Sequence, residues 1–267
     1  MLGDPDPGGD VHHREAALDH LLHRLGPELI RVLLAVAHKH LGHCHELWRP
    51  DVYERLVGPN SIPGWRPSLG QTGSAQSHLA KSEVGAGDTF LFFGWFRRVE
   101  EVAGKYRYIK SEPQLHVIFG WLEVDEVLSV VSDRQGSLDR HPWVSAHPHV
   151  LSPEHYDDPK NTIYVGKSRS ELGSSLEPGG GYLRRFDPML QLTAPGKTRS
   201  IWSLPEWFHP GNGRTPMSYH ASEDRWTRDQ HRVLLRSVAK GQEFVVDGAE
   251  YPEMSEWASA IIRAGRA

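Results

Sequence analysis

The stretch from residue 84 to residue 124 constrains the fold of this chain most, because two apolar runs alternate there with turn residues. Residues 89–96 (TFLFFGWF) and 115–124 (LHVIFGWLEV) are rich in Phe, Trp, Val and Ile, and a polar segment with Gly104 separates them. Short apolar runs bounded by turn residues are typical of buried β-strands. We therefore predict that 84–96 and 115–124 form neighbouring strands of one sheet.

A Gly-Trp pair lies inside each of these two runs, at Gly94-Trp95 and at Gly120-Trp121. Glycine within a strand often marks a bulge or the close approach of another group. The two pairs can therefore form an aromatic wall beside an open backbone, or both Trp side chains can simply fill the core. Arg97, at the end of the first run, either meets an anionic ligand or belongs to a solvated rim.

The composition is that of a soluble globular protein, with 267 residues, 38% hydrophobic and 24% charged. The formal net charge of −4 gives no overall positive field for non-specific nucleic-acid binding, although a local basic patch remains compatible with it. Cys44 is the single cysteine, which fits a reducing compartment. We find no secretion signal and no run long enough to span a bilayer, so we predict a cytoplasmic protein.

Residues 1–45 are predicted to be a helical appendage, and residues 46–267 the main domain. Apolar residues at helical spacing predict helices over 14–25 and 27–42, and Gly26-Pro27 separates them. A cluster of imidazole and thiol side chains follows, with His38, His40, His43, Cys44 and His45. It resembles a metal site in composition but has no matching second cluster, so we predict no metal.

Residues 71–80 (QTGSAQSHLA) predict a short helix with an unusual number of polar groups. Gln71 and Gln76 carry amides that can hydrogen bond to an adenine edge in two places. His78 can transfer a proton. The alternative is an ordinary solvated helix face.

The segment His147-Pro148-His149 places two imidazoles next to one proline. Proline holds the preceding backbone extended, so we expect both rings to point the same way. Such a pair suits a metal, a phosphate or a polar base edge, although the further ligands that a metal needs are missing. Asn161 then opens another predicted strand, over residues 161–166.

Ser218, Tyr219 and His220 form a compact polar triplet in the last third of the chain. No nucleophile-elbow pattern surrounds Ser218, so we do not interpret it as a hydrolase serine. Strands are predicted at 233–239 and 243–247, and the apolar face of a final helix over 252–264 is expected to cap the β core.

Several of these motifs, in order, resemble one family. They include GWRPSLGQTGSAQSHL, VGAGDTFLFFGWFRRVEE, HVIFGWLEV, HPHV, NTIYVG, SIWSLPEWF, PMSYH and KGQEFVVD. Over residues 64–257 the chain is similar to the nucleotide modification associated domain 3 family. That resemblance implies a role in bacterial and phage systems that make or handle modified nucleic-acid bases, but it supplies no reaction mechanism.

The first 45 residues depart from this resemblance, because family members are expected to begin with a short strand and an Asp-, Ser-, Gly- and Pro-rich segment. A second, looser resemblance concerns residues 84–124, whose pattern is similar to base-binding barrels of the PUA, ASCH and EVE type. It would make Trp95 and Trp121 stacking surfaces for a base.

Together these observations predict an α+β fold with a strongly bent mixed sheet or an open, PUA-like β-barrel, peripheral helices and long ordered loops. We predict a domain that binds or processes a nucleotide or a modified base, with DNA, RNA or other components of a modification system as further partners. The predicted ligand-binding residues are Gln71, Gln76, His78, Trp95, Arg97, Trp121, His147, His149, Asn161, Ser218, Tyr219 and His220. We expect the polar ones to converge on a single cleft.

Two alternatives remain open at this point. The first is an enzyme of nucleotide modification, with His147, His149 or His220 as acid or base and Asp88 or Glu243 as the orienting carboxylate. The second is a protein-interaction module without a small-molecule site. No cofactor and no membrane association are predicted.

Overall fold

The computed structural model describes residues 62–151, 157–238 and 243–266. The predicted appendage at residues 1–45 and the His and Cys cluster within it lie outside the described residues. Among the described residues, no helix has the length and apolar character needed to cross a membrane.

The main sheet is built on the long strand β5 (Leu115–Ser129). Its first part pairs with β2 (Thr89–Phe96), and its last part pairs with β6 (Thr162–Gly166). The order of the strands is β1-β6-β5-β2, where β1 is Ser68–Gln71 and β7 (Gly180–Tyr182) adds a further pairing to β5. All of these pairs are antiparallel. The predicted pairing of 84–96 with 115–124 is confirmed.

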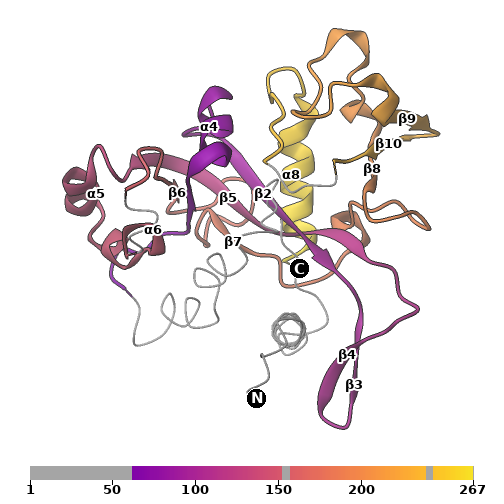
Figure 1. Cartoon of the computed structure of the whole chain (residues 1–267), viewed down its shortest axis with the longest axis horizontal. Coiled ribbons are helices and arrows are strands. Elements are labelled where there is room, and N and C mark those ends of the chain that lie inside the picture. The colour runs from indigo at the N-terminus through magenta and orange to yellow at the C-terminus, as the bar shows by residue number, and fades with distance from the viewer. Residues whose placement is uncertain (1–61, 152–156, 239–242, 267) are drawn as a thin grey trace, which may run out of the picture.

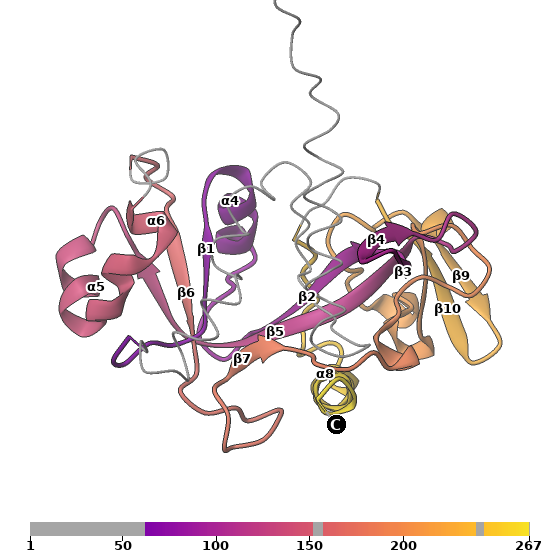
Figure 2. The ribbon, with the colours of Figure 1, turned by 90° about the horizontal axis from the view of Figure 1, so that it is seen from below.

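Two irregularities bend this sheet into a half-barrel. The register between β2 and β5 shifts between Phe92 and Phe93, and the register between β5 and β6 shifts between Val124 and Glu126. An extra residue on one strand bends that strand and increases its twist. Figure 2 shows β5 curving from the α5–α6 side of the molecule to the β8–β10 side. The fold is therefore α+β with a strongly curled antiparallel sheet, as predicted.

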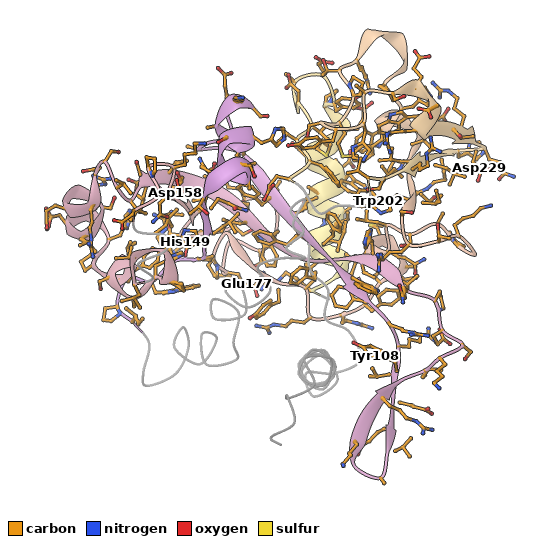
Figure 3. All side chains as sticks on the ribbon, viewed as in Figure 1. Tyr108, His149, Asp158, Glu177, Trp202 and Asp229 are labelled. Carbon is orange, nitrogen blue, oxygen red and sulfur yellow. The ribbon has the colours of Figure 1, made fainter. Side chains whose placement is uncertain are left out.

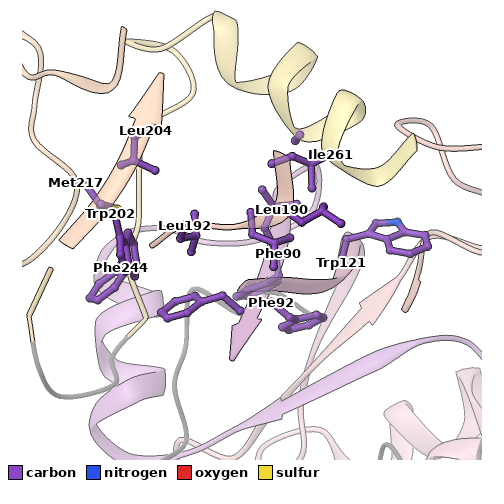
Figure 4. Packing of buried hydrophobic residues seen from close by; sticks show 14 of the residues in the cluster. Phe90, Phe92, Trp121, Leu190, Leu192, Trp202, Leu204, Met217, Phe244 and Ile261 are labelled. Carbon is purple, nitrogen blue, oxygen red and sulfur yellow. The ribbon is translucent and has the colours of Figure 1, made fainter. Parts of the chain in front are cut away.

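The main hydrophobic core lies against β2 and β5 (Figure 4). Phe90, Phe92 and Trp121 are buried there, and α8 (Glu253–Ala264) adds a buried face that includes Ile261. The final helix thus caps the β core, as its apolar stripe predicts.

A second, smaller core lies on the other face of β6. Ile163 and Val165 point into it, whereas Tyr164 between them belongs to the main core. This alternation follows from the two-residue period of a strand. The smaller core is closed by α5 (Arg134–Arg140), the 3-10 helix η1 (Pro142–Ala146) and α6 (Pro148–Leu151).

Two further sheets extend from the main one (Figure 1). β3 (Val99–Val102) and β4 (Lys105–Tyr108) form a hairpin that projects from the end of β2. β8 (Ile201–Pro205), β10 (Arg232–Arg236) and β9 (Trp226–Asp229) form a three-stranded sheet. The remaining elements are α4 (Gly73–Lys81) and the 3-10 helices η2 (Pro188–Leu190), η3 (Glu206–Phe208), η4 (Gly211–Gly213) and η5 (Glu223–Arg225).

Three local predictions need correction. The helix predicted over 71–80 begins only at Gly73, because Gln71 pairs with Thr162 as the last residue of β1 and Thr72 has an extended backbone. No strand forms over residues 243–247, although the carbonyl of Val245 accepts from the N–H of Ser218 and its own N–H donates to the Ser218 hydroxyl.

The third correction concerns His147-Pro148-His149, which was predicted to be extended throughout. His147 is extended, with ψ of 135°, but Pro148 begins the short helix α6. Proline restricts the residue before it to extended conformations, while its own φ suits the first turn of a helix. The two imidazoles therefore do not share one extended backbone, and the predicted common direction of the rings does not follow.

Gly120 has the closest backbone neighbour among the glycines of the curled sheet that the structure describes, and it supplies the first prediction. A Cβ atom at this position would lie 2.6 Å from the backbone oxygen of Gly181 on β7. We expect Gly120→Ala to lower the free energy of unfolding by roughly 1–3 kcal/mol, because backbone cannot move aside as a side chain can. Urea unfolding measures this change.

Gly248→Ala is the matched control, since a Cβ atom there has no neighbour within 4 Å. Equal stabilities of the two variants would contradict the close contact between β5 and β7.

Candidate functional site

His78 on α4 and Ser218 in the loop before β9 come together although 140 positions separate them in sequence. The Nε2 atom of His78 lies 3.1 Å from the Oγ atom of Ser218, within hydrogen-bonding distance. The imidazole also packs against the ring of Tyr219, with 4.7 Å between ring centroids. Two segments that the sequence analysis selected independently thus form one contact.

Ser218 is held in place by the segment that follows β10. Its Oγ accepts a hydrogen bond of 2.8 Å from the backbone N–H of Val245, and its own N–H donates to the carbonyl of Val245. The hydroxyl is therefore fixed before any ligand arrives, which fits a role in orienting His78.

Tyr219 has a strained backbone and an exposed side chain. Its φ is 65°, in the left-handed region that side chains other than glycine rarely adopt, and 46% of its surface is exposed. Residues held in such conformations cost on the order of 1–3 kcal/mol and cluster at functional sites. The strained backbone thus exposes the phenol ring to solvent, and packing of the ring does not account for this conformational free-energy cost.

A hollow of about 420 Å³ opens beside this contact. Its lining comes from the exposed side of α4, from Tyr219 and from the turn that leads into β6: Gly73, Ser74, Ser77, His78, Lys81, Lys160 and Tyr219. Asp158 accepts hydrogen bonds from the backbone N–H groups of Gly73 and Lys160, so it joins the two sides of the hollow. Two ammonium groups, two serine hydroxyls and two aromatic rings therefore surround one space.

Glu243 lies behind the hollow and links it to β1. Its carboxylate accepts a hydrogen bond of 2.8 Å from the side-chain amide of Gln71. Burial raises the pKa of Glu243, while burial lowers the pKa of His78, opposed in part by a hydrogen bond to the backbone of Glu243. Two neighbouring titratable groups thus have pKa values shifted in opposite directions.

His220 is fully buried under the same loop, with none of its surface exposed. Its Nδ1 lies 2.8 Å from the carbonyl oxygen of Ser218, and its Nε2 accepts from the N–H of Val238. Since both ring nitrogens are engaged and the ring packs on Phe244, His220 fixes the loop and does not line the hollow.

His147, His149 and Asn161 form a separate cluster, and Figure 3 shows His149 on the α6 side of the molecule. The side chain of Asn161 bonds to His149 twice, once to Nδ1 and once to the carbonyl oxygen. The His149 ring lies directly over Gly70, where a Cβ atom would come within 2.2 Å of it. Both His rings are buried and neither lines the hollow, so the structure does not bring all the predicted polar residues to one cleft.

Two further predicted ligand-binding residues, Trp121 and Gln76, are also buried. Trp121 has no exposed surface, and its ring packs beneath Arg266 and hydrogen bonds to Glu123, so it offers no face to a ligand in this conformation. Gln76 is buried on α4, where its side-chain oxygen accepts a hydrogen bond from the hydroxyl of Tyr164.

The other candidates lie at the surface, away from the residues that line the hollow. Trp95 is 44% exposed at the end of β2. Arg97 donates to the carbonyl oxygens of Glu112 and Lys110, at the base of the β3–β4 hairpin. Asp88 accepts from the N–H of Gly85, which closes the turn before β2.

The sequence analysis did not select Lys81 and Lys160, the two charged residues that line the hollow. Lys81 follows His78 by three positions on α4, and such residues share one face of a helix, so this signal was present. Lys160 had no comparable signal in the sequence, because its position beside the hollow depends on the path of the loop that leads into β6. In the described part of the chain, no group of three or more His, Cys, Asp or Glu side chains could hold a metal ion.

The fold and the hollow define an α+β protein with a small polar and aromatic site at the edge of a curled sheet. The chain belongs to the nucleotide modification associated domain 3 family, whose model matches residues 19–247. The match includes Gln71, His78, Ser218, Tyr219 and Glu243, and it reaches into the segment assigned above to the appendage. No curated protein and no solved structure matches the chain.

The buried His220 leads to a prediction about pH. Burial lowers its pKa to about 4, whereas an unfolded chain binds this proton near pH 6.5. Between these values the unfolded state binds more protons, so we expect the stability to fall as the pH drops from 6.5 toward 4, by on the order of 2 kcal/mol. Urea unfolding at several pH values measures this loss.

His220→Gln should be less stable at pH 7 and should show a smaller loss on acidification. His231→Gln, which replaces an exposed imidazole in the turn between β9 and β10, is the control and should behave as the wild type. An unchanged pH dependence in His220→Gln would contradict this assignment.

Proposed function

We propose that this protein binds a nucleotide, or a single base of a nucleic acid, in the hollow between α4 and Tyr219. Membership in the nucleotide modification associated domain 3 family places the protein in nucleotide modification in general. The proposal adds a site and a ligand class to that general role.

The observation that carries the proposal is the pair of rings formed by the exposed Tyr219 and the half-buried His78. The His78–Ser218 hydrogen bond orients one ring, and the strained backbone of residue 219 presents the other. A base can stack on such rings, and base-aromatic stacking contributes roughly 1–3 kcal/mol per base. Simple packing would not need Tyr219 in a left-handed conformation with nearly half of its surface exposed.

The charges around the hollow support a phosphorylated ligand. Lys81 and Lys160 line it, while Asp158 is occupied with the N–H groups of Gly73 and Lys160. Ammonium groups bind phosphate as point charges without a strict geometry. The volume of about 420 Å³ lies within the range of small-molecule sites, which run from roughly 300 to 1,000 Å³.

A second candidate function is acid-base catalysis on the bound nucleotide. It is favoured by the opposite pKa shifts of His78 and Glu243, because environments that separate two pKa values create an acid and a base. In this reading His78, whose pKa is lowered, accepts a proton, and Glu243, whose pKa is raised, supplies one. Turnover of a nucleotide by the wild type that Glu243→Gln abolishes, with binding retained, would favour catalysis over binding alone.

Tyr219→Gly is the variant that tests the binding proposal. Glycine relieves the left-handed strain, so we expect the free energy of unfolding to stay within about 1 kcal/mol of the wild type or to rise. The stacking face is lost, so we expect affinity for deoxynucleoside monophosphates to fall about tenfold or more. Isothermal titration calorimetry and urea unfolding measure the two effects.

Gln230→Gly is the matched control, because Gln230 also has a left-handed backbone, with φ of 52°, in the turn between β9 and β10. This variant should relieve strain without changing affinity. Equal nucleotide binding by Tyr219→Gly and the wild type, or no binding by the wild type across unmodified and modified nucleotides, would reject the proposal and leave the interaction module as the better account.

A further inference from the structure

A stacked pair formed by Trp95 and Arg199 lies outside the hollow. The guanidinium of Arg199 lies 3.9 Å from the centroid of the Trp95 ring, and one of its nitrogens donates to the side-chain oxygen of Gln114. Trp95 is nevertheless 44% exposed. No carboxylate forms a salt bridge with Arg199 among the described residues, so its charge is not neutralised by a neighbour in this part of the chain.

Further positively charged residues are connected to this pair along the chain or through backbone hydrogen bonds. Arg97 and Arg98 follow Trp95 in the chain, Lys110 accepts through its carbonyl oxygen from Arg97, and Lys197 lies in the same turn as Arg199. Glu112 is the acidic residue at the base of the hairpin, and it pairs with Arg98 at 3.8 Å. We define the Trp95 patch as Trp95, Arg97, Arg98, Lys110, Lys197 and Arg199. The patch is basic although the whole chain has a formal net charge of −4.

One backbone pairing, followed by a series of ring contacts, joins this patch to the hollow. Trp95 pairs with His116 across the β2–β5 ladder, and the His116 ring lies 5.7 Å from that of Trp202. Trp202 in turn contacts Phe244, and Phe244 contacts Tyr219 at 6.4 Å. The two sites are therefore attached to one rigid aromatic core and keep a fixed separation.

We propose that the Trp95 patch binds a single-stranded segment of nucleic acid that continues from the nucleotide in the hollow. This inference rests on the proposed function and deepens it, because it makes the substrate a polynucleotide. An exposed indole stacked on a guanidinium gives flat surfaces for unpaired bases, and the surrounding cations meet phosphates. Bases in a duplex are already stacked on each other and cannot use such a surface.

The test compares two probes on the full chain. The first is a fluorescein-labelled single-stranded DNA of about 12 nucleotides, within the range of single-strand site sizes. The second is a deoxynucleoside monophosphate. We expect Trp95→Leu and Arg199→Gln each to weaken binding of the DNA about tenfold and to leave binding of the mononucleotide unchanged. In Arg199→Gln the slope of log affinity against log salt should also become shallower by about 0.7.

Arg169→Gln is the matched control, because it removes one exposed positive charge in the loop after β6, away from any described aromatic stack. It should leave DNA affinity near the wild-type value. Near-UV circular dichroism checks that each variant is folded. If Trp95→Leu is not folded, the test relies on Arg199→Gln alone.

The outcomes separate the two proposals. DNA binding that depends on Trp95 and Arg199, with no mononucleotide binding by any form, supports a single-strand site at the patch but rejects the hollow as a nucleotide site, and with it the continuation of the strand into the hollow. DNA binding that is equal in wild type, Trp95→Leu and Arg199→Gln overturns the patch, as does a wild type that fails to bind DNA. Loss of mononucleotide and DNA binding in equal proportion in Arg199→Gln, or tighter binding to duplex than to single strands, also overturns it.

Discussion

The curl of β5 is the constraint on which the rest of the structure depends. One strand pairs with β2 at its start and with β6 at its end, and the two register shifts turn these pairings toward each other. Gly120 allows the backbone of β7 to approach the bend. The β6 edge carries β1 and then α4, while Phe93 on β2 packs against Phe244 and Trp202. The curl therefore brings α4 to the loop that contains Ser218 and Tyr219.

The hollow combines rigid support with a strained, exposed ring. Behind it, the amide of Gln71 bonds to Glu243, and His220 holds the loop by bonding to the carbonyl of Ser218 and the N–H of Val238. In front of it, Tyr219 keeps a backbone conformation that its side chain disfavours. Buried polar groups that are fully bonded specify one arrangement, and this arrangement maintains the strain. This rigid support fits the proposed nucleotide site, which would need little reorganisation on binding.

Strands β2, β5 and β6 and the final helix could be predicted from sequence, because long apolar runs and helical stripes are local signals. The sequence predicted that the polar segments containing His78 and Ser218 would lie close together. It did not predict that these two side chains would contact each other. The positions of His149 and Trp121 could not be predicted, because the residues that cover these rings are distant in sequence. Gly70 lies against the His149 ring, and Arg266 lies over the Trp121 ring. Tyr219 was selected for its chemistry, but its left-handed backbone has no local signature. The close approach at Gly120 was foreseen because glycine within a strand has few other uses.

The central claim is that a nucleotide occupies the hollow between α4 and Tyr219, and ring resonances report on it most directly. The measurement is a nuclear magnetic resonance titration of the assigned histidine and tyrosine rings with a deoxynucleoside monophosphate. The account predicts saturable shifts of the His78 and Tyr219 rings with one shared affinity, while the rings of His149 and His231 stay unchanged. Saturable shifts confined to His147 and His149, or no shift at His78 and Tyr219 at any concentration, would contradict it.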